Sequence, residues 1–272
     1  MIVAALWLFV GALNAWLLLR CLARVDLLTF FSVYIASWAA SNVSPGQLGD
    51  ALQIVLLRRH GIPAAASAAA YFVDKVISLV WMMMVAAFGV ALYTASVKGW
   101  WLLVVPAAVA VGSLTAFSLL RRLPRSVRGV ARLQDFADGL TGQLAALRRH
   151  PRRIALNATL TVTKWAIVGT KYYCAFLAFG KLIPFSAAST IPVASSLVGY
   201  IPVTVGGIGT TEWTAVALFE RAGVEAEVVV GVYLFLRVLL LLLAFFIHSL
   251  LHFIDPAYKL SGAEPRGKSP VC

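Results

Sequence analysis

Long apolar runs are the feature that most constrains the fold of this chain. A helix crosses a bilayer with about 20 consecutive apolar residues, whereas a transmembrane β-strand needs only about ten of alternating polarity. The runs here are continuous, and 61% of the residues are hydrophobic while only 12% are charged. We therefore predict an all-α integral membrane protein with about five transmembrane helices, at residues 2–19, 72–95, 101–120, 156–180 and 228–253.

The basic residues predict which side of the membrane each segment faces. The formal net charge is +12, and nine arginines fall between Arg121 and Arg153 in one long polar connection. Cytoplasmic loops carry an excess of Lys and Arg. We place this loop and the tail, 256–272, in the cytoplasm and the N-terminus outside. Leucines at helical spacing in the loop predict an amphipathic helix at about 126–150. This charge placement indicates topology, so no nucleic-acid partner is expected.

Two further apolar stretches are too short to cross the membrane. Each has two apolar arms around a glycine-containing turn, at 27–40 with 51–57 and at 185–200 with 213–219. Two short arms with both ends on one side predict a re-entrant helical hairpin. Non-helical backbone at membrane depth is tolerated only where protein buries it or where it lines a wet cavity.

The two hairpins resemble each other in sequence. A shift of 162 residues matches scarce residue types, namely Asp50 with Glu212, Arg59 with Arg221, Gly61 with Gly223, Tyr71 with Tyr233 and Lys75 with Arg237. A shift of 160 aligns the turns, Gly46 with Gly206 and Gly49 with Gly209. The hairpins enter from opposite faces, so we predict an inverted repeat within one transmembrane domain, 1–255. Its units, about 1–97 and 154–255, are joined by helix 101–120 and the amphipathic helix.

A single arginine, Arg237, interrupts the most apolar run, Val228–Ile247. A charge near the bilayer centre is costly and usually marks a function. Its repeat counterpart is Lys75, and Lys171 lies similarly deep in the 156–180 span. Cations in a low-dielectric cavity bind phosphate strongly. We therefore predict a shared anion-binding cavity between the two units.

Other residues near the hairpins extend this predicted site. Arg59 and Arg221 stand at the hairpin exits, and Asp50 and Glu212 lie next to the glycine turns. The two acids either carry protons or serve as helix caps and ion-pair partners of these arginines, and both interpretations stay open. Lys75 equally either faces the cavity or pairs with the preceding acid.

The glycine turns offer backbone donors. Gly206, Gly207 and Gly209 precede a helix that we predict to start at Thr210, where the positive end of the helix would favour an anion. Gly46 and Gly49 could act in the same way, more weakly, in the first unit. Glycine turns also serve close packing.

Motifs for several enzyme classes are missing from the sequence. We find no nucleophile elbow, no nucleotide-binding phosphate loop and no acid-rich metal motif. The cysteines Cys21, Cys174 and Cys272 lie too far apart for metal-ligand or redox spacing. We expect no cofactor and no ATP-driven transport or metal-dependent hydrolysis within the chain.

Two motifs carry a family resemblance. The first is Asn42-Val-Ser-Pro-Gly-Gln-Leu-Gly-Asp50 with the later Asp74-Lys75, and the second is Ile201-Pro-Val-Thr-Val-Gly-Gly-Ile-Gly-Thr-Thr-Glu212 with the later Arg237. With them, about 1–255 resembles the lysylphosphatidylglycerol synthase transmembrane region family, the flippase-like domain of bacterial and archaeal membrane proteins. Members usually have Pro where Val205 stands and commonly Glu-Arg in place of Asp74-Lys75.

The resemblance implies translocation of a polar-headed lipid between leaflets, in the bacterial cytoplasmic (inner) membrane. Family substrates include aminoacylated phosphatidylglycerol and, by proposal, polyprenyl-phosphate-linked sugars. The chain lacks the soluble aminoacyl transferase domain of the bifunctional members. We therefore expect that it does not make the lipid itself.

Our hypothesis from the sequence is a lipid flippase rather than an enzyme. Lys75 and Arg237 would hold the phosphate of an anionic headgroup lipid, and Asp50 and Glu212 would compete for these cations. One alternative is a membrane transferase that uses a lipid-phosphate donor, with Asp50 or Glu212 as base. Another is a non-transporting partner subunit of a glycolipid pathway. A homo-oligomer and a complex with pathway enzymes both remain open.

Overall fold

The computed structural model describes residues 1–44, 49–93, 128–200 and 204–254, and its elements in these ranges are all helices. They are α1 (Ile2–Leu19), α2 (Leu27–Asn42), α3 (Gly49–Arg59), α4 (Ala64–Tyr93), α6 (Arg128–Arg148), α7 (Pro151–Ala178), α8 (Phe185–Val198), α9 (Thr210–Phe219), α10 (Ala226–Ile254) and the short 3₁₀ helix η2 (Glu220–Ala222). The predicted all-α class is confirmed.

Three of the described helices, α1, α4 and α10, are long and apolar enough to cross a membrane. Helix α7 has 28 residues, enough to cross, but it is more polar than these three. Helix α8 is apolar but short. The structure therefore supports an integral membrane protein, and three of the four predicted spans that fall in the described residues are clear spans. The predicted span 101–120 and the tail 256–272 lie outside the described residues.

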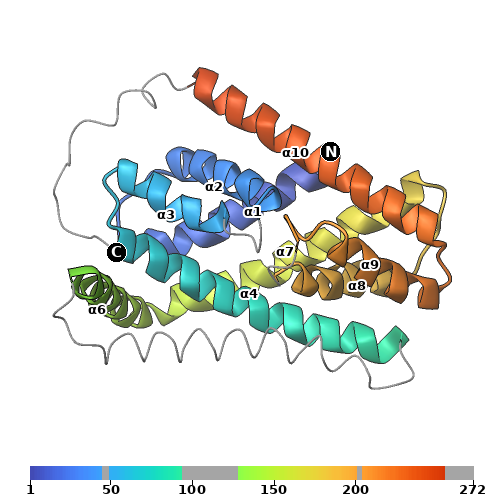
Figure 1. The fold of residues 1–272 in the computed structure, drawn as a ribbon, viewed down its shortest axis with the longest axis horizontal. Coiled ribbons are helices and arrows are strands. Elements are labelled where there is room, and N and C mark those ends of the chain that lie inside the picture. Colours follow the sequence, from blue (N-terminus) through green and yellow to red (C-terminus); the bar gives the residue numbers. More distant parts are fainter. Residues whose placement is uncertain (45–48, 94–127, 201–203, 255–272) are drawn as a thin grey trace.

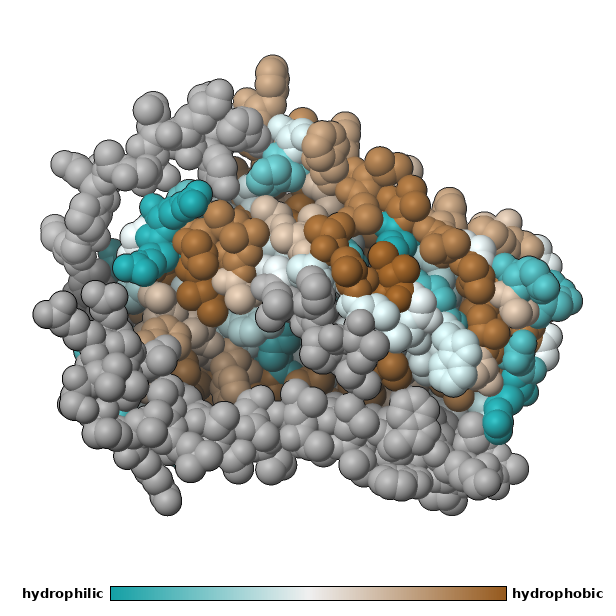
Figure 2. Space-filling view, viewed as in Figure 1, coloured by the Kyte–Doolittle hydropathy of each residue, from teal (hydrophilic) through white to brown (hydrophobic). Residues whose placement is uncertain are grey.

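The outer faces of α4 and α10 are apolar. On α4 the exposed residues recur every four positions, at Phe72, Val76, Val80, Met84 and Phe88. Such spacing places them on one face of the helix. Figure 2 shows a similar apolar band along α10, where Phe245 and Phe246 are both more than half exposed. Contiguous exposed apolar surface of this kind suits contact with lipid.

Two pairs of short helices form helical hairpins. Helix α2 packs on α3, and α8 packs on α9. The side chain of Asp26 caps α2 by accepting the Thr29 N–H at 2.7 Å. Gly49 begins α3 so close to α2 that a Cβ atom there would collide with the backbone of Ala40 and Ser41. The arms lie within a few residues of those expected from hydropathy.

The helices of the two halves pack reciprocally. Helix α4, which follows the first hairpin, packs on α8 of the second hairpin, and α10, which follows the second hairpin, packs on α2 of the first. The first helices of the two halves, α1 and α7, pack on each other. Figure 1 shows α10 along one side and α4 along the other, with both hairpins between them. Exchanging the halves therefore reproduces most of these helix contacts.

The tips of the two hairpins meet. The backbone N–H of Gly206, in the turn before α9, donates to the carbonyl oxygen of Ser44 at 2.9 Å. Gly206 has φ +58°, and a Cβ atom there would collide with Asn42. Only glycine adopts such a backbone at low cost and permits this approach.

Helix α6 lies within the predicted amphipathic segment and packs on α4 and α7. Leu147 is buried at its C-terminal end, whereas Phe136 is 40% exposed. Part of the predicted apolar stripe thus covers the other helices, and part faces outward.

Candidate functional site

A cavity of about 240 Å³ lies between the two halves of the protein. Its wall is built from α1, α2, α3, α4, α7, α8, α9 and α10 together with the turn before α9. Both halves thus contribute to one partly enclosed space. Ligand pockets are common at interfaces between packed units, and this one is slightly smaller than the usual range.

The cavity wall carries more basic than acidic side chains. Among the described residues, its cations are Lys75, Lys164, Lys171 and Arg237, and its acids are Asp74 and Glu212. Lys75 and Arg237, the pair matched by the internal repeat, line the same cavity, as does Lys171. A predominance of cations in a partly enclosed space attracts anions because the low local dielectric strengthens the interaction.

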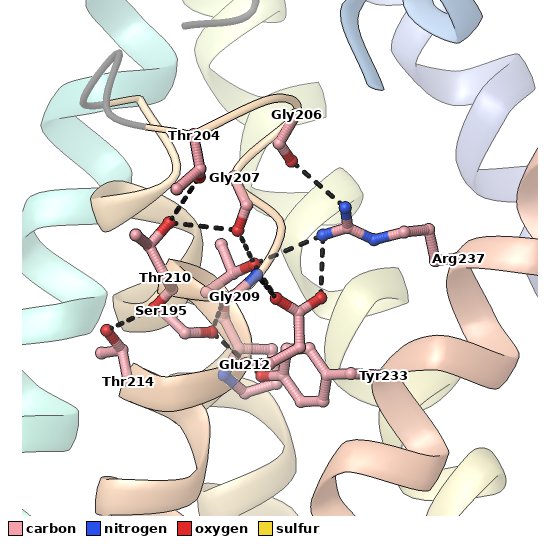
Figure 3. Close-up of polar contacts among 12 residues, drawn as sticks. Ser195, Thr204, Gly206, Gly207, Gly209, Thr210, Glu212, Thr214, Tyr233 and Arg237 are labelled. Atoms are coloured by element: carbon pink, nitrogen blue, oxygen red, sulfur yellow. Dashed lines mark hydrogen bonds and ion pairs between the residues drawn. The ribbon is translucent and has the colours of Figure 1, made fainter. Parts of the chain in front are cut away.

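Arg237 forms an ion pair with Glu212. Its Nη2 lies 2.9 Å from Glu212 Oε1, and the two side chains are only 18% and 9% exposed. The guanidinium also donates to the carbonyl oxygen of Gly206 at 3.4 Å and to Thr211 Oγ1 at 3.3 Å. Figure 3 shows the side chain reaching from α10 to the glycine turn. The arginine therefore joins α10 to the start of α9.

Glu212 is also the N-terminal cap of α9. Its Oε2 accepts the Gly209 N–H at 2.7 Å and the Thr211 hydroxyl at 2.9 Å. Glu212 thus caps the helix and pairs with Arg237 rather than with Arg221, and the proton-carrying role stays a prediction. Arg221 lies exposed at the far end of α9, in η2.

Three donors of the glycine turn have partners within the protein. The Gly206 N–H bonds to Ser44, the Gly209 N–H bonds to Glu212, and the Thr210 hydroxyl donates to the carbonyl oxygen of Gly207 at 3.1 Å. An external anion bound to these groups would have to replace those partners, and its binding at this turn stays a prediction. The anion at the helix N-terminus is the carboxylate of the protein itself.

Aromatic rings surround the two lysines. The Lys171 ammonium lies 4.5 Å from the centroid of the Trp7 ring and 5.1 Å from that of Tyr172. The Lys75 ammonium lies 5.3 Å from the Tyr71 ring and 5.5 Å from the Tyr200 ring. Cation–π contacts stabilise an ammonium group without neutralising it. The rings thus stabilise the ammonium groups of both lysines at the cavity wall.

Other predicted site residues lie elsewhere. Arg59 and Arg221 are exposed, and neither is among the described residues that line the cavity. Gly49 serves the contact between α3 and α2. Gly46 and the side chain of Asp50 lie outside the described residues.

Asp74 binds asparagine amides. Its Oδ1 accepts N–H groups from Asn14 of α1 at 3.1 Å and from Asn157 of α7 at 2.9 Å. Asn14 also donates to Thr161 Oγ1 at 2.9 Å. Neither asparagine was among the predicted site residues, although a polar side chain inside an apolar span is itself a sequence signal.

A family model of the lysylphosphatidylglycerol synthase TM region matches residues 1–247. The chain belongs to this family. The match includes α1 to α9, most of α10, and every described residue of the cavity wall. The family resemblance inferred from the two hairpin motifs is confirmed.

The chain is also similar to two archaeal proteins. It is 29% identical over 110 residues to a UPF0104 membrane protein of Methanothermobacter thermautotrophicus, covering 39% of this chain and 33% of that protein. It is 34% identical over 105 residues to a UPF0104 membrane protein of Pyrococcus horikoshii, covering 39% of this chain and 30% of that protein. The matched segment thus spans about a third of each relative. No solved structure matches the chain.

Proposed function

We propose that this chain moves an anionic lipid with a phosphate headgroup, a phospholipid or a polyprenyl-phosphate-linked lipid, between membrane leaflets. The observation that carries the proposal is the shared cavity, where Lys75, Lys171 and Arg237 come together from different helices. Phosphate is the anion best suited to such a site because arginine and lysine both bind it through charge-assisted hydrogen bonds. The acyl or prenyl chain stays in the bilayer during transport.

The reciprocal helix packing supports an inverted repeat. In this proposal α2–α3 and α8–α9 are re-entrant hairpins that enter from opposite faces, and their tips meet near the middle of the membrane. Transporters with inverted repeats place the substrate at the interface between the repeats, near the midplane. The proposed topology has the N-terminus outside and the segment 121–153 in the cytoplasm of the cell.

The ion pair between Arg237 and Glu212 gives the proposed transport a release step. A phosphate oxygen that binds Arg237 competes with Glu212 for the same guanidinium. When the phosphate leaves, the carboxylate 2.9 Å away takes its place, so the arginine is never left unpaired in a low-dielectric site. The site therefore binds a headgroup without trapping it.

Reconstituted vesicles test the proposed transport. Purified protein is incorporated into liposomes with a headgroup-labelled anionic phospholipid, and an impermeant quencher added outside reports how much label reaches the outer leaflet. We expect the wild-type protein to raise the quenched fraction above that of protein-free vesicles. The Arg237→Met variant should remove most of this gain.

A matched control separates the site from general charge effects. Lys181 is also a cation paired with a glutamate, Glu225, at 2.6 Å, but the pair is exposed and neither residue lines the cavity. Lys181→Met should transport like the wild type. Equal quenching in wild-type, Arg237→Met and empty vesicles would refute transport. Labelled headgroup recovered on another molecule would instead favour the transferase.

A further inference from the structure

A second polar cluster borders the cavity through Asp74, apart from the ion pair of Arg237. It joins α1, α4 and α7 through Asn14, Asp74, Asn157 and Thr161. The side chains of Asn14, Asn157 and Thr161 are completely buried. Asn157 Nδ2 also donates to the main-chain oxygen of Asn14 at 3.1 Å. The proposed lipid transport assigns no role to this cluster.

Two oxygens of the cluster have no hydrogen-bond partner. They are the amide Oδ1 atoms of Asn14 and Asn157, both fully buried. Buried polar atoms are almost always paired, and an unpaired one costs about 1–3 kcal/mol. In each amide the nitrogen donates to Asp74 while the oxygen is unpaired, so the oxygen can turn toward Asp74 without losing a hydrogen bond of its own.

The oxygens of the cluster suit a small hard cation. A half-turn of each amide about its last side-chain bond exchanges the nitrogen and the oxygen. The oxygens of Asn14 and Asn157 would then face Asp74, joined by Thr161 Oγ1 and the main-chain oxygen of Asn14. Four neutral oxygens and one carboxylate balance a single positive charge. Ca²⁺ and Mg²⁺ usually take more carboxylates or retain several waters.

We propose that this cluster binds a monovalent metal cation, with Na⁺ as the ion that fits its size and charge. Asp74 lines the cavity, so the ion would enter and leave by the same space as the headgroup. The nearby lysines contact other groups: Lys164 donates to Ser78 Oγ at 3.1 Å, and Lys75 lies over two tyrosine rings. The binding stands on its own, whereas its use to drive transport rests on the proposed function.

The coupling has a physical basis in the three helices that the cluster joins. A cation turns both amides inward and replaces the hydrogen bonds that now tie α1 and α7 to Asp74. It also supplies a positive charge close to the cationic wall of the cavity. Ion occupancy thus changes both the helix contacts and the attraction for an anionic headgroup, which is the differential interaction that coupling requires.

Thermal unfolding tests the binding without any lipid substrate. The purified protein is heated in NaCl, KCl or N-methylglucamine chloride at equal ionic strength. We expect Na⁺ to raise Tm by about 5 °C at saturation over the organic cation, with a hyperbolic concentration dependence. Asp74→Asn should abolish the Na⁺ effect. Equal Tm in all three salts would overturn the proposal. The amide oxygens of Asn14 and Asn157 would then be expected to bind buried water instead.

A milder variant guards against loss of the fold. Thr161→Val removes one oxygen at nearly constant volume and should raise the Na⁺ concentration needed for half of the effect about tenfold. Thr163→Val, on the exposed side of the same helix, should leave it unchanged. If both variants respond like the wild type, the cluster is not the site.

Vesicle transport separates this inference from the proposed function. Na⁺ binding without lipid movement would support the cation site and refute the proposed lipid transport. Lipid movement at the same rate in Na⁺ and in N-methylglucamine would keep the flippase and refute the coupling. A rate that follows the Na⁺ concentration seen in unfolding, and is lost in Asp74→Asn, is the result we expect.

Discussion

Breaking the ion pair between Arg237 of α10 and Glu212 of α9 should reveal how strongly these two charges stabilise each other. Removing one partner of a buried pair costs about 3–5 kcal/mol, because the other charge is left uncompensated. In Arg237→Met, Glu212 keeps the bonds from the Gly209 N–H and the Thr211 hydroxyl to Oε2, and only Oε1 loses its partner. We therefore expect the low end of that range, about 3 kcal/mol.

Removing the charge of Glu212 instead should lower the free energy of unfolding by less. In Glu212→Gln the amide oxygen can still accept the Gly209 N–H and cap α9, as glutamine does in a capping box. Arg237 then keeps its bonds to Gly206 and Thr211 and remains 18% exposed toward the cavity. We therefore expect Glu212→Gln to lower the free energy of unfolding by about 1–2 kcal/mol. The double variant leaves no orphaned charge, so about 2 kcal/mol is expected, less than Arg237→Met alone.

Thermal or denaturant unfolding of the four proteins in detergent measures this cycle. At about 2–4 °C per kcal/mol, Arg237→Met should lower Tm by roughly 6–12 °C, and the double variant should recover part of the loss. Strict additivity, with the double variant less stable than either single one, would refute the reasoning. The pair would then be two independent contacts rather than one coupled unit.

Three further predictions concern packing, charge and topology. Gly49→Ala should destabilise the protein by about 1–3 kcal/mol in an unfolding experiment, because the new methyl group meets the backbone of α2. Gly142→Ala is the control: it has open space around it, so the free energy of unfolding should be unchanged or higher. Lys171→Met should leave Tm unchanged or raised, since a buried charge is replaced by an apolar chain, yet reduce vesicle transport. Single cysteines replacing Arg59 and Arg221 should react with an impermeant thiol reagent from opposite sides of the membrane, and labelling from one side would refute the inverted repeat.

Charge and hydropathy made the main features of the fold and site predictable. The apolar arms located both hairpins, because a stretch too short to cross must turn back. The scarcity of charge in the spans pointed to Arg237, Lys75 and Lys171, because every ionised group there needs a specific reason. All three line the observed cavity. The start of α4 was placed too late, at residue 72, although the alanine-rich segment from Ala64 already favours helix.

Side-chain directions could not be obtained in the same way. The rings of Trp7 and Tyr172 around Lys171 come from different helices, so their meeting depends on helix rotation and crossing. The pairing of Glu212 with Arg237 rather than Arg221 has the same origin. Both arginines follow the acid in the sequence, but only the packing of α10 against α9 decides which one reaches it.

The contact between the hairpin tips indicates how the cavity opens. Among the described residues of the two turns, a backbone hydrogen bond from Gly206 to Ser44 joins them, and such a bond contributes only about 1 kcal/mol net. By contrast, α4 packs along α8, and α10 packs along α2. Separating the halves would expose these long apolar contacts, and so would moving a whole hairpin, because α2 and α8 are arms of the hairpins. We therefore expect alternating access by movement at the hairpin turns, with α2 and α8 staying packed on the long helices. Gly206→Ala, whose new methyl group would meet the backbone of Asn42, should force the two turns apart and change the transport rate in vesicles, and a wild-type rate in this variant would rule this movement out.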